Sequence, residues 1–228
     1  MTGDHRRVVA LVPARDEEDT VAQTVAALRG LRLDDVVVVD DGSSDATSAA
    51  ALTAGATVLR IPGHAGKGGA MEGALDRLPP ADIWLFADAD LGASAAGLAT
   101  VLDVVVAGRA DMAIAMFPPQ AGSGMGTVRR TSATAIRLLS HFRPEAPLSG
   151  QRAITATCLA ALRPLAGGFG VETAMTIDAV RAGFRVVEIP VPGLTHRATG
   201  RSIRGFTHRG RQGLHIARAA AIRAVRLR

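Results

Sequence analysis

Two apolar runs in this chain each end in a pair of carboxylates. Residues 36–41 are four valines followed by two aspartates, and the apolar run that begins at Ile83 is followed by Asp88 and Asp90. Short β-branched or aromatic runs bounded by polar residues are typical of buried strands in a parallel sheet. Ligands of such sheets bind at the carboxyl ends of the strands, and carboxylates at alternate positions suit a hard divalent ion. The sequence therefore predicts a cation site at one edge of an α/β sheet.

Strand patterns and helix patterns alternate along the chain. We expect strands at residues 8–12, 36–39, 58–61, 83–87, 112–117 and 184–191, and helices at residues 19–28, 46–54, 66–78, 94–107, 128–142, 171–182 and after residue 205. Residues 118–124 and 192–205 are expected to form loops, and residues 147–152 a polar turn. This alternation indicates an α/β fold in which helices flank a mostly parallel central sheet.

Length and composition favour a single domain over residues 1–228. The chain is 48% hydrophobic, which allows a large core. Its longest apolar stretch, residues 95–107, is too short to cross a bilayer and contains Asp103. The first residues lead straight into a predicted strand, so we expect no signal peptide. The one cysteine, Cys158, cannot form an internal disulfide, which favours a reducing cytoplasm.

Charge is divided unevenly along the chain. Residues 1–128 contain 17 acidic and 9 basic side chains, whereas residues 129–228 contain 4 acidic and 17 basic ones. A basic half suits a phosphate-bearing partner or an anionic membrane surface. Aromatic residues make up only 3% of the chain and tyrosine is absent, so surfaces for base stacking are scarce. We therefore expect no nucleic-acid partner.

Lys67 is the single lysine among 26 basic positions, and it lies in a glycine-rich turn at residues 66–69. Glycines leave room for a compact ammonium group to approach a phosphate. We prefer this functional interpretation to the chance survival of one lysine in an arginine-rich sequence.

Four segments near the ends of predicted strands form an ordered series. They are Pro13-Ala14-Arg15-Asp16-Glu17-Glu18, Val38-Val39-Asp40-Asp41-Gly42-Ser43-Ser44-Asp45, Gly66-Lys67-Gly68-Gly69-Ala70 and Asp88-Ala89-Asp90. In this order they resemble the motifs of family 2-like glycosyltransferases of the GT-A fold, and the resemblance covers nearly the whole chain. It implies a metal-dependent enzyme whose donor is a nucleotide-diphosphate sugar, such as UDP-glucose.

The resemblance implies a role for each donor motif. Asp88 and Asp90 are implied to hold Mg²⁺ or Mn²⁺, which neutralises the departing diphosphate, and Lys67 adds a charge to the same oxygens. Asp90 and Lys67 are therefore candidate catalytic residues. Asp41 is implied to contact the base or the ribose, and Glu17 the ribose side. The other implied donor contacts are Pro13, Ala14, Arg15, Lys67, Asp88 and Ala89.

The remaining acidic residues of these loops are expected to serve the fold. Asp45 is expected to cap the helix at residues 46–54. Asp16, Glu18 and Asp19 are expected to be charges in the first turn of the helix at residues 19–28, where a carboxylate interacts well with the helix dipole.

The second half, residues 126–228, resembles the acceptor-binding part of two groups within this family, and residues 1–125 the nucleotide-sugar-binding part. Its segments Pro147-Leu148-Ser149-Gly150-Gln151-Arg152, Gly168-Phe169-Gly170-Val171-Glu172 and Thr195-His196-Arg197 are similar to those of glucosyl-3-phosphoglycerate synthases and polyprenyl-phosphate sugar transferases. The acceptor implied is phosphate-bearing, either small or lipid-linked. By the same resemblance, His196 joins Asp88 and Asp90 as the third metal ligand.

Glu172 is the only carboxylate between Glu145 and Asp178. It is the candidate catalytic base if the transfer inverts configuration, or an acceptor-positioning group if the transfer retains it. A plain helix N-terminal charge is its alternative role. Guanidinium groups bind phosphate oxygens bidentately, so we expect three arginines to hold the acceptor phosphate. The candidate acceptor contacts are Gly150, Arg152, Gly170, Glu172, Arg197 and Arg201.

Other classes of function stay open. A signalling receiver domain also combines acidic strand ends with a lysine, but its lysine lies late in the sheet, whereas Lys67 precedes Asp88 here. A sugar-nucleotide-binding protein without turnover would keep the same donor motifs. A nucleotidyltransferase is disfavoured because residues 13–17 contain no glycine. We also leave open a homodimer, and a peripheral contact between the basic C-terminal helix and the anionic inner face of a membrane.

Overall fold

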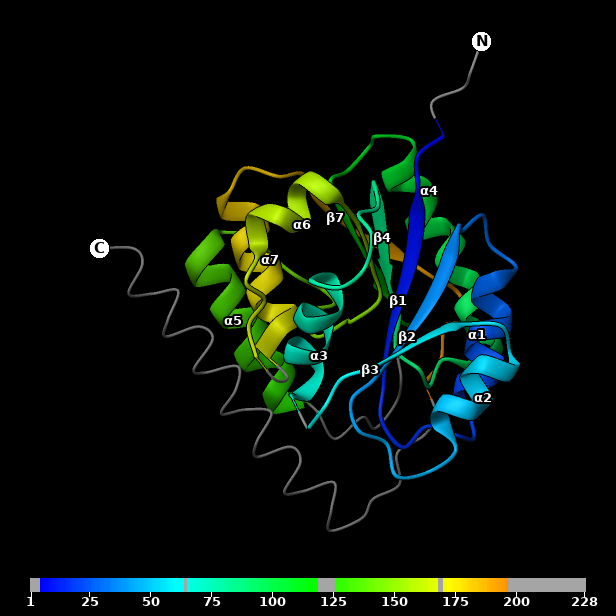
Figure 1. Ribbon diagram of the computed structural model, residues 1–228. Coiled ribbons are helices and arrows are strands. Elements are labelled where there is room, and N and C mark those ends of the chain that lie inside the picture. The colour runs from blue at the N-terminus through cyan, green and yellow to red at the C-terminus, as the bar shows by residue number, and fades with distance from the viewer. Residues whose placement is uncertain (1–4, 64, 119–125, 168–169, 197–228) are drawn as a thin grey trace.

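The computed structural model describes residues 5–63, 65–118, 126–167 and 170–196. Within these ranges, a seven-stranded sheet has helices on both of its faces (Figure 1). The strands are β1 (Val8–Ala14), β2 (Asp35–Asp40), β3 (Thr57–Arg60), β4 (Ile83–Phe86), β5 (Met112–Met116), β6 (Arg152–Thr155) and β7 (Val186–Pro190). The helices are α1 (Val21–Arg29), α2 (Thr47–Thr53), α3 (Gly66–Leu75), the 3-10 helix η1 (Gly92–Leu98), α4 (Ala99–Val106), α5 (Gly126–Ser140), α6 (Ala156–Leu162) and α7 (Val171–Arg181). The predicted α/β fold is confirmed.

The strand order is β3-β2-β1-β4-β6-β5-β7, and every neighbouring pair is parallel except the two that involve β6. The chain first adds β2 and β3 on one side of β1 and then places β4 on the other side. In an open α/β sheet, such a reversal of direction opens a crevice at the carboxyl ends of the strands, where ligands bind. The acidic ends of β2 and β4 therefore lie at the same edge of the sheet.

Side chains of β1 alternate between two apolar cores. Val8, Ala10 and Val12 belong to the core beneath α1, η1 and α4, whereas Val9 and Leu11 belong to the core beneath α3, α6 and α7 (Figure 1). Successive side chains of a strand point to opposite faces, so a strand that is covered on both faces must be apolar at every position. This explains the uninterrupted valine run of β2.

The second half departs from the predicted pattern at β6. We expected a polar turn at residues 147–152, but Arg152 begins a strand that runs antiparallel between β4 and β5. Thr155, the last residue of β6, also caps α6, because its side chain accepts a hydrogen bond from the backbone N–H of Cys158 at 3.2 Å. A strand of four residues and a helix of seven are too short for periodicity to identify.

The structure differs from the predicted elements at one helix, and several predicted segments are not described. The single helix predicted at residues 94–107 is divided into η1 and α4. The predicted loop from residue 119, the basic loop from residue 197 and the C-terminal helix lie outside the described residues. Among the residues that are described, no helix has the length and apolar character needed to span a membrane.

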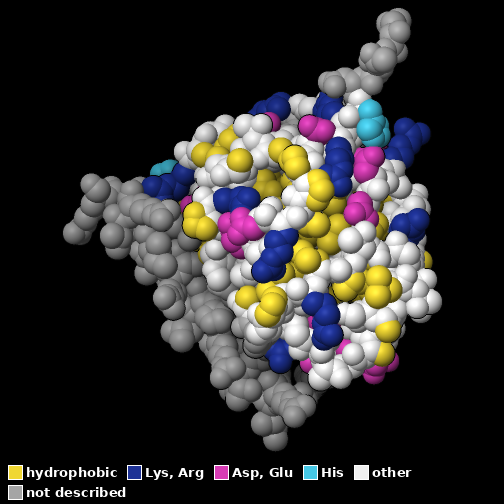
Figure 2. Space-filling model, in the orientation of Figure 1, with side chains coloured by type: hydrophobic (Ala, Val, Ile, Leu, Met, Phe, Trp, Pro, Cys, Tyr) yellow, Lys and Arg dark blue, Asp and Glu magenta, His cyan; other side chains and the backbone are white. Residues whose placement is uncertain are grey.

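Charged side chains from the two halves of the chain meet beside α3. Arg163 from the second half forms ion pairs with Glu72 and Asp76 at the end of α3. Figure 2 shows basic and acidic side chains next to one another on this face, around a hollow of hydrophobic side chains. The hollow has a volume of about 190 Å³, and residues of α3 and α6 line it together with Trp84 of β4. Because Trp84 lies near the start of β4, this hollow is distinct from the acidic strand ends.

Candidate functional site

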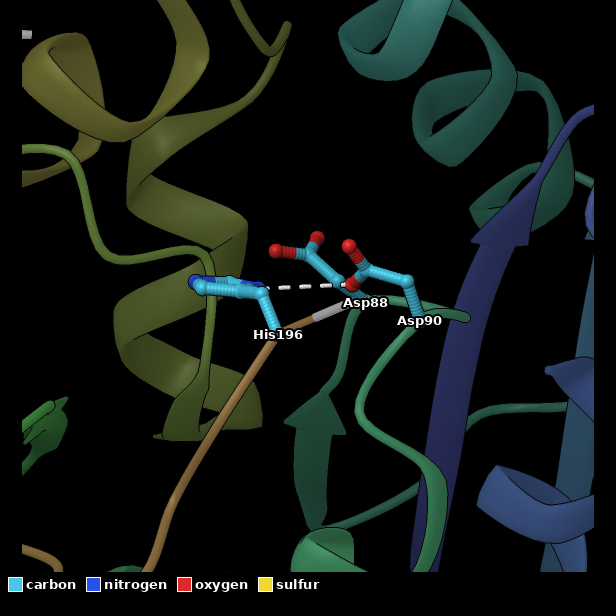
Figure 3. Close-up of side chains that lie close together, drawn as sticks. All are labelled: Asp88, Asp90 and His196. Carbon is cyan, nitrogen blue, oxygen red and sulfur yellow. Dashed lines mark hydrogen bonds and ion pairs between the residues drawn. The ribbon is translucent and has the colours of Figure 1, made fainter. Parts of the chain in front are cut away.

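Asp88, Asp90 and His196 point toward one another just beyond the carboxyl end of β4 (Figure 3). One ligand atom of each residue lies within 4.8 Å of those of the other two. Asp90 Oδ1 is 3.4 Å from His196 Nδ1, the contact drawn as a dashed line. Carboxylate oxygens suit Mn²⁺ and Mg²⁺, and imidazole is a common ligand of transition-metal ions. The three predicted ligands thus lie together and fit a divalent ion, and their role as ligands stays a prediction.

Each end of this cluster is supported by a neighbouring side chain. The ring of His196 stacks on Phe117, with ring centroids 4.0 Å apart and ring planes 19° apart. The hydroxyl of Thr24, in α1, donates to the carbonyl oxygen of Ala89 and accepts from the backbone N–H of Gly92, both at 2.8 Å. The turn that contains Asp90 is therefore fixed on both sides by one buried threonine.

Asp88 is held by two side chains. Lys67 Nζ lies 2.5 Å from Asp88 Oδ1, and Gln151 Nε2 donates to Asp88 Oδ2 at 2.7 Å. Burial alone would raise the pKa of the Asp88 carboxyl, but the charge and hydrogen bond of Lys67, helped by His196 and Gln151, lower it below its ordinary value. Asp88 is therefore ionised at neutral pH.

Lys67 joins the two halves of the predicted site. Its ammonium contacts Asp88 and also lies 2.7 Å from Glu172 Oε1, in the first turn of α7. Burial opposes the charge of the ammonium, yet the two carboxylates raise its pKa above the ordinary lysine value. Lys67 is therefore a permanent positive charge beside the candidate metal ligands.

Close packing explains two of the glycines around Lys67. A Cβ on Gly150 would collide with Lys67 Nζ and would lie 3.0 Å from Asp88 Oδ1. A Cβ on Gly68 would collide with the carbonyl oxygen of Ala166. The start of α3 is therefore pressed between two segments of the second half, which fixes the place of the ammonium group.

The position of Glu172 fits both a helix N-terminal charge and a group of the substrate site. It lies in the first turn of α7, where a carboxylate interacts favourably with the helix dipole. Its residue is only 6% exposed, and its carboxylate meets Lys67 within the site. Gly170, the other described candidate of this segment, is the residue that immediately precedes α7.

The acidic pair at the end of β2 is engaged by the protein itself. Both oxygens of Asp41 accept hydrogen bonds, from the backbone N–H groups of Ala65 and Gly66, each at 2.9 Å. Asp41 thereby holds the turn that leads into Lys67. Its predicted contact with the base or ribose stays a prediction.

Asp40, the first residue of this pair, is completely buried. Its carboxylate accepts the backbone N–H of Ser43 at 2.7 Å and the hydroxyl of Ser48, and Arg60 Nε lies 3.3 Å away. Burial would raise the pKa of Asp40, but these hydrogen bonds and the Arg60 charge lower it below its ordinary value. Asp40 is therefore a buried, ionised anchor of the loop after β2.

The expectation that Asp16, Glu18 and Asp19 belong to the first turn of a helix is wrong, because the first turn of α1 contains no acidic residue. Asp16 Oδ1 instead accepts the backbone N–H of Ser44 at 2.8 Å, and Glu18 Oε2 accepts that of Ala46 at 2.9 Å. Free backbone N–H groups in a loop need such partners. The loops after β1 and β2 are therefore tied to each other.

Asp45 was expected to cap α2, but the N-cap position is Ala46, which makes no side-chain cap. The Asp45 carboxylate, one residue earlier, still accepts the backbone N–H of Thr47, the first residue of α2, at 3.0 Å. Glu17 Oε2 accepts the hydroxyl of Thr20 at 2.8 Å. Pro13 and Ala14 end β1, and Arg15 next to them has a side chain that is 44% exposed. The loop thus lies at the predicted edge of the sheet, and its donor contacts stay predictions.

The structure places Arg152 where it cannot hold an acceptor phosphate. We expected its guanidinium to hold the acceptor phosphate, but the residue is 0% exposed, because Arg152 belongs to a central strand of the sheet. Its Nε donates to the carbonyl oxygen of Ser149 at 2.8 Å and one Nη donates to Thr176 at 3.0 Å. Burial lowers the pKa of Arg152 to about 10. The other two predicted clamps, Arg197 and Arg201, lie outside the described residues.

Sequence reasoning missed Gln151 and Phe117 as members of the site. Gln151 lies inside a motif that the resemblance had already marked, but a single buried glutamine produces no periodic signal. Phe117 is the last residue of a predicted strand and had been counted only as part of it. Only the tertiary structure brings the two residues to Asp88 and His196.

Comparison with known proteins agrees with this geometry. Residues 9–164 match the model of the family described as glycosyl transferase family 2. The chain is 30% identical over 198 residues to a glucosyl-3-phosphoglycerate synthase from Mycolicibacterium paratuberculosis, and the match covers 76% of this chain and 60% of the relative. It is 27% identical over 187 residues to the glycosyltransferase AglJ from Haloferax volcanii, covering 80% and 61%. The chain thus spans about three fifths of the length of these curated relatives.

Solved structures show the same fold. The crystal structure of glucosyl-3-phosphoglycerate synthase from Mycobacterium tuberculosis with Mn²⁺, uridine diphosphate and phosphoglyceric acid has a TM-score of 0.77 and 26% identity, covering 96% of this chain and 78% of that one. The structure of the same enzyme with Mg²⁺ and uridine diphosphate has a TM-score of 0.78 and 26% identity, covering 96% and 79%. The fold is thus the GT-A fold predicted from the four motifs. Because the family model matches more than half of its residues, this chain belongs to glycosyl transferase family 2.

Proposed function

We propose that this protein is a metal-dependent glycosyltransferase that moves a hexose from a UDP-sugar, such as UDP-glucose, to a phosphate-bearing acceptor. The observation that carries the proposal is the grouping of Asp88, Asp90 and His196 at the carboxyl end of β4, with Lys67 beside it. Membership of the family excludes the receiver-domain alternative. The solved relatives that contain uridine diphosphate with Mn²⁺ or Mg²⁺ support the choice of donor and metal.

The arrangement suits a displacement at the anomeric carbon of the donor. A divalent ion bound by Asp88, Asp90 and His196 would neutralise the charge that builds up on the diphosphate. The bond between the sugar C1 and the diphosphate oxygen breaks, and its electron pair leaves with UDP. A new bond forms between C1 and an acceptor hydroxyl oxygen, whose proton passes to the departing UDP or to water. Lys67 supplies a second positive charge close to the leaving diphosphate.

The acceptor side begins at Glu172. Its Oε1 forms an ion pair with Lys67 on the donor side. This ion pair places Glu172 between the donor side and the acceptor side, so we favour the acceptor-positioning role of Glu172 over that of the catalytic base. Gly150 packs against Lys67 and Gly170 immediately precedes α7, so both are near this pair and remain proposed acceptor contacts. Arg197 and Arg201 complete the proposed contacts to the acceptor phosphate.

Two acceptor types satisfy this chemistry, and they differ in their need for a membrane. A small phosphorylated acid, of the kind present in the solved relative, requires only the site described above. A polyprenyl phosphate would require the protein to lie at an anionic bilayer. We favour the small acceptor and expect that the protein does not sediment with vesicles containing anionic phospholipid. Salt-sensitive sedimentation would instead favour the lipid-linked acceptor.

A donor panel tests the proposal. UDP-, GDP- and ADP-sugars are incubated with phosphoglycerate and either Mn²⁺ or Mg²⁺, and release of the nucleoside diphosphate is measured. We expect release from a UDP-hexose that depends on the metal and falls at least 100-fold in Asp90→Ala. Asp103→Ala, which removes an exposed carboxylate from α4, is the matched control and should keep full activity.

The same panel contains the outcomes that contradict the proposal. Full activity of Asp90→Ala would exclude a metal-dependent transfer at this site. Binding of UDP and Mn²⁺ without release of nucleotide from any donor would favour the alternative of a sugar-nucleotide-binding protein without turnover.

A further inference from the structure

Gln151 is a buried polar residue whose side chain serves the candidate metal centre. It is 0% exposed, and its Nε2 donates to Asp88 Oδ2 at 2.7 Å. The carboxylate has no proton to give, so only the nitrogen of the amide can face it. The orientation of the amide group therefore follows from its partner.

The segment that carries Gln151 is itself firmly held. The carbonyl oxygen of Gln151 accepts the backbone N–H of Ala115 at 2.9 Å, which fixes it to β5. Two residues earlier in the chain, Ser149 is held at both of its backbone groups. Its carbonyl oxygen accepts a hydrogen bond from Arg152 Nε, and its N–H donates to the carbonyl oxygen of Ala146 at 3.1 Å. The buried arginine that cannot reach an acceptor thus secures the segment that reaches Asp88.

Lys67 and Gln151 divide the carboxylate of Asp88 between them. Lys67 meets Oδ1 and Gln151 meets Oδ2, so rotation of the carboxylate would break at least one of the two hydrogen bonds. Gly150 allows this approach, because a Cβ there would lie 3.0 and 3.2 Å from the two Asp88 oxygens. A neutral amide fixes the oxygen without adding a second positive charge beside the ion site.

We propose that Gln151 is a positioning residue that fixes the rotamer of Asp88 and thereby sets the affinity of the Asp88–Asp90–His196 cluster for a divalent ion. The proposal rests on the proposed function in one respect, that this cluster binds the metal. Partners that orient a metal ligand typically change metal affinity about 10- to 100-fold when they are removed. The second half of the chain would then supply both a ligand of the metal site, His196, and the amide that positions Asp88.

Direct measurement of Mn²⁺ binding tests this role without relying on catalysis. Free Mn²⁺ is quantified by electron paramagnetic resonance in the presence of UDP, for the wild type and for Gln151→Leu, which keeps a similar volume but loses the donor. We expect about a 10- to 100-fold weaker Mn²⁺ affinity in Gln151→Leu. Gln23→Leu removes the other glutamine that the structure describes, an exposed residue of α1, and should leave the affinity unchanged.

Two additional readouts separate positioning from a general loss of structure. In steady-state assays, Gln151→Leu should raise the Mn²⁺ concentration needed for half-maximal rate, while the rate at saturating Mn²⁺ recovers to within about threefold of wild type. Gln151→Asn, whose shorter amide cannot reach Asp88, should behave in the same way and serves if Gln151→Leu does not fold. A folded variant of either kind with wild-type Mn²⁺ affinity overturns the proposal. Wild-type protein that binds Mn²⁺ but transfers no sugar would contradict only the proposed function.

Discussion

The acidic ends of β2 and β4 lie at the same edge of the sheet, but their carboxylates are held in different ways. Asp40 and Asp41 bind backbone N–H groups and hydroxyls that all come from the first half of the chain, within 25 residues. Asp88 also has a partner in the first half, Lys67, which is 21 residues away, but Asp88 and Asp90 further contact Gln151 and His196, which are 63 and 106 residues away. The first end is therefore built from contacts within the first half, whereas the second is complete only once the two halves have come together.

This difference indicates where each end is vulnerable. Substitutions at the β2 end should act first on the stability of the fold, because buried carboxylates there replace missing backbone partners. Substitutions at the β4 end should act first on metal binding and transfer, because the side chains there are positioned by distant segments and surround the candidate cation site. The following predictions test this division.

Gly150→Ala should have the largest effect on activity. The new Cβ would displace Lys67 Nζ and crowd the Asp88 carboxylate, and displacements of about 1 Å in a site typically cost on the order of 100-fold in rate. The measurement is the rate of nucleotide release at saturating Mn²⁺. Gly73→Ala in α3, whose Cβ would make only an ordinary contact at 3.5 Å, is the matched control and should retain full activity. Equal rates for the two variants would show that Lys67 does not need its observed position.

Asp40→Asn should destabilise the protein without a proportionate loss of Mn²⁺ affinity. Hydrogen bonds to a buried charged group typically contribute about 1.5–3 kcal/mol, so we expect unfolding in urea at pH 7 to show a loss of about 2 kcal/mol. Asp103→Asn on the exposed face of α4 should change the free energy of unfolding by less than about 0.5 kcal/mol. A larger effect on Mn²⁺ affinity than on stability would remove the distinction between the two strand ends.

The pH dependence of this effect follows from the lowered pKa of Asp40. A carboxyl whose pKa is lower in the folded than in the unfolded protein stabilises the fold above its ordinary pKa, here 3.8. That contribution is lost as the pH falls through the lower, folded value. The stability difference between wild type and Asp40→Asn should therefore be full at pH 7 and shrink below pH 3.8, as measured by urea unfolding across this range.

Phe117→Leu should have the smallest effect. It removes the ring that stacks on His196 but keeps an apolar side chain at the end of β5. Aromatic pairs are worth about 0.5–1.5 kcal/mol, which corresponds to roughly a 2- to 10-fold weaker Mn²⁺ affinity. Leu138→Ala, a change at an exposed hydrophobic residue of α5, is the control. An unchanged affinity in Phe117→Leu would show that His196 is positioned without the stack.

The order of the strands and helices, and the carboxylates Asp88 and Asp90 of the candidate site, could be predicted because short stretches of sequence identify them. Four buried residues at β4 and the valine run of β2 identify strands without any knowledge of their neighbours. The motif Asp88-Ala89-Asp90 then marks a strand end by itself. Strand β6 could not be identified in this way, because its four residues owe their extended form to pairing with β4 and β5. For the same reason Arg152 was expected in a polar turn that binds the acceptor, whereas it lies in the core.

The sequence by itself determined the α/β alternation, the two acidic strand ends and the lone lysine, since each depends on residue type and spacing within a short segment. The third candidate metal ligand, His196, came only from the resemblance to a known family. Only the tertiary structure decided which carboxylates support the fold and which face the cation site. It also brought Gln151, Phe117 and Glu172 to that site and buried Arg152. The physical reason is that hydrogen bonds and burial depend on distances between segments far apart in the chain, and no local pattern records those distances.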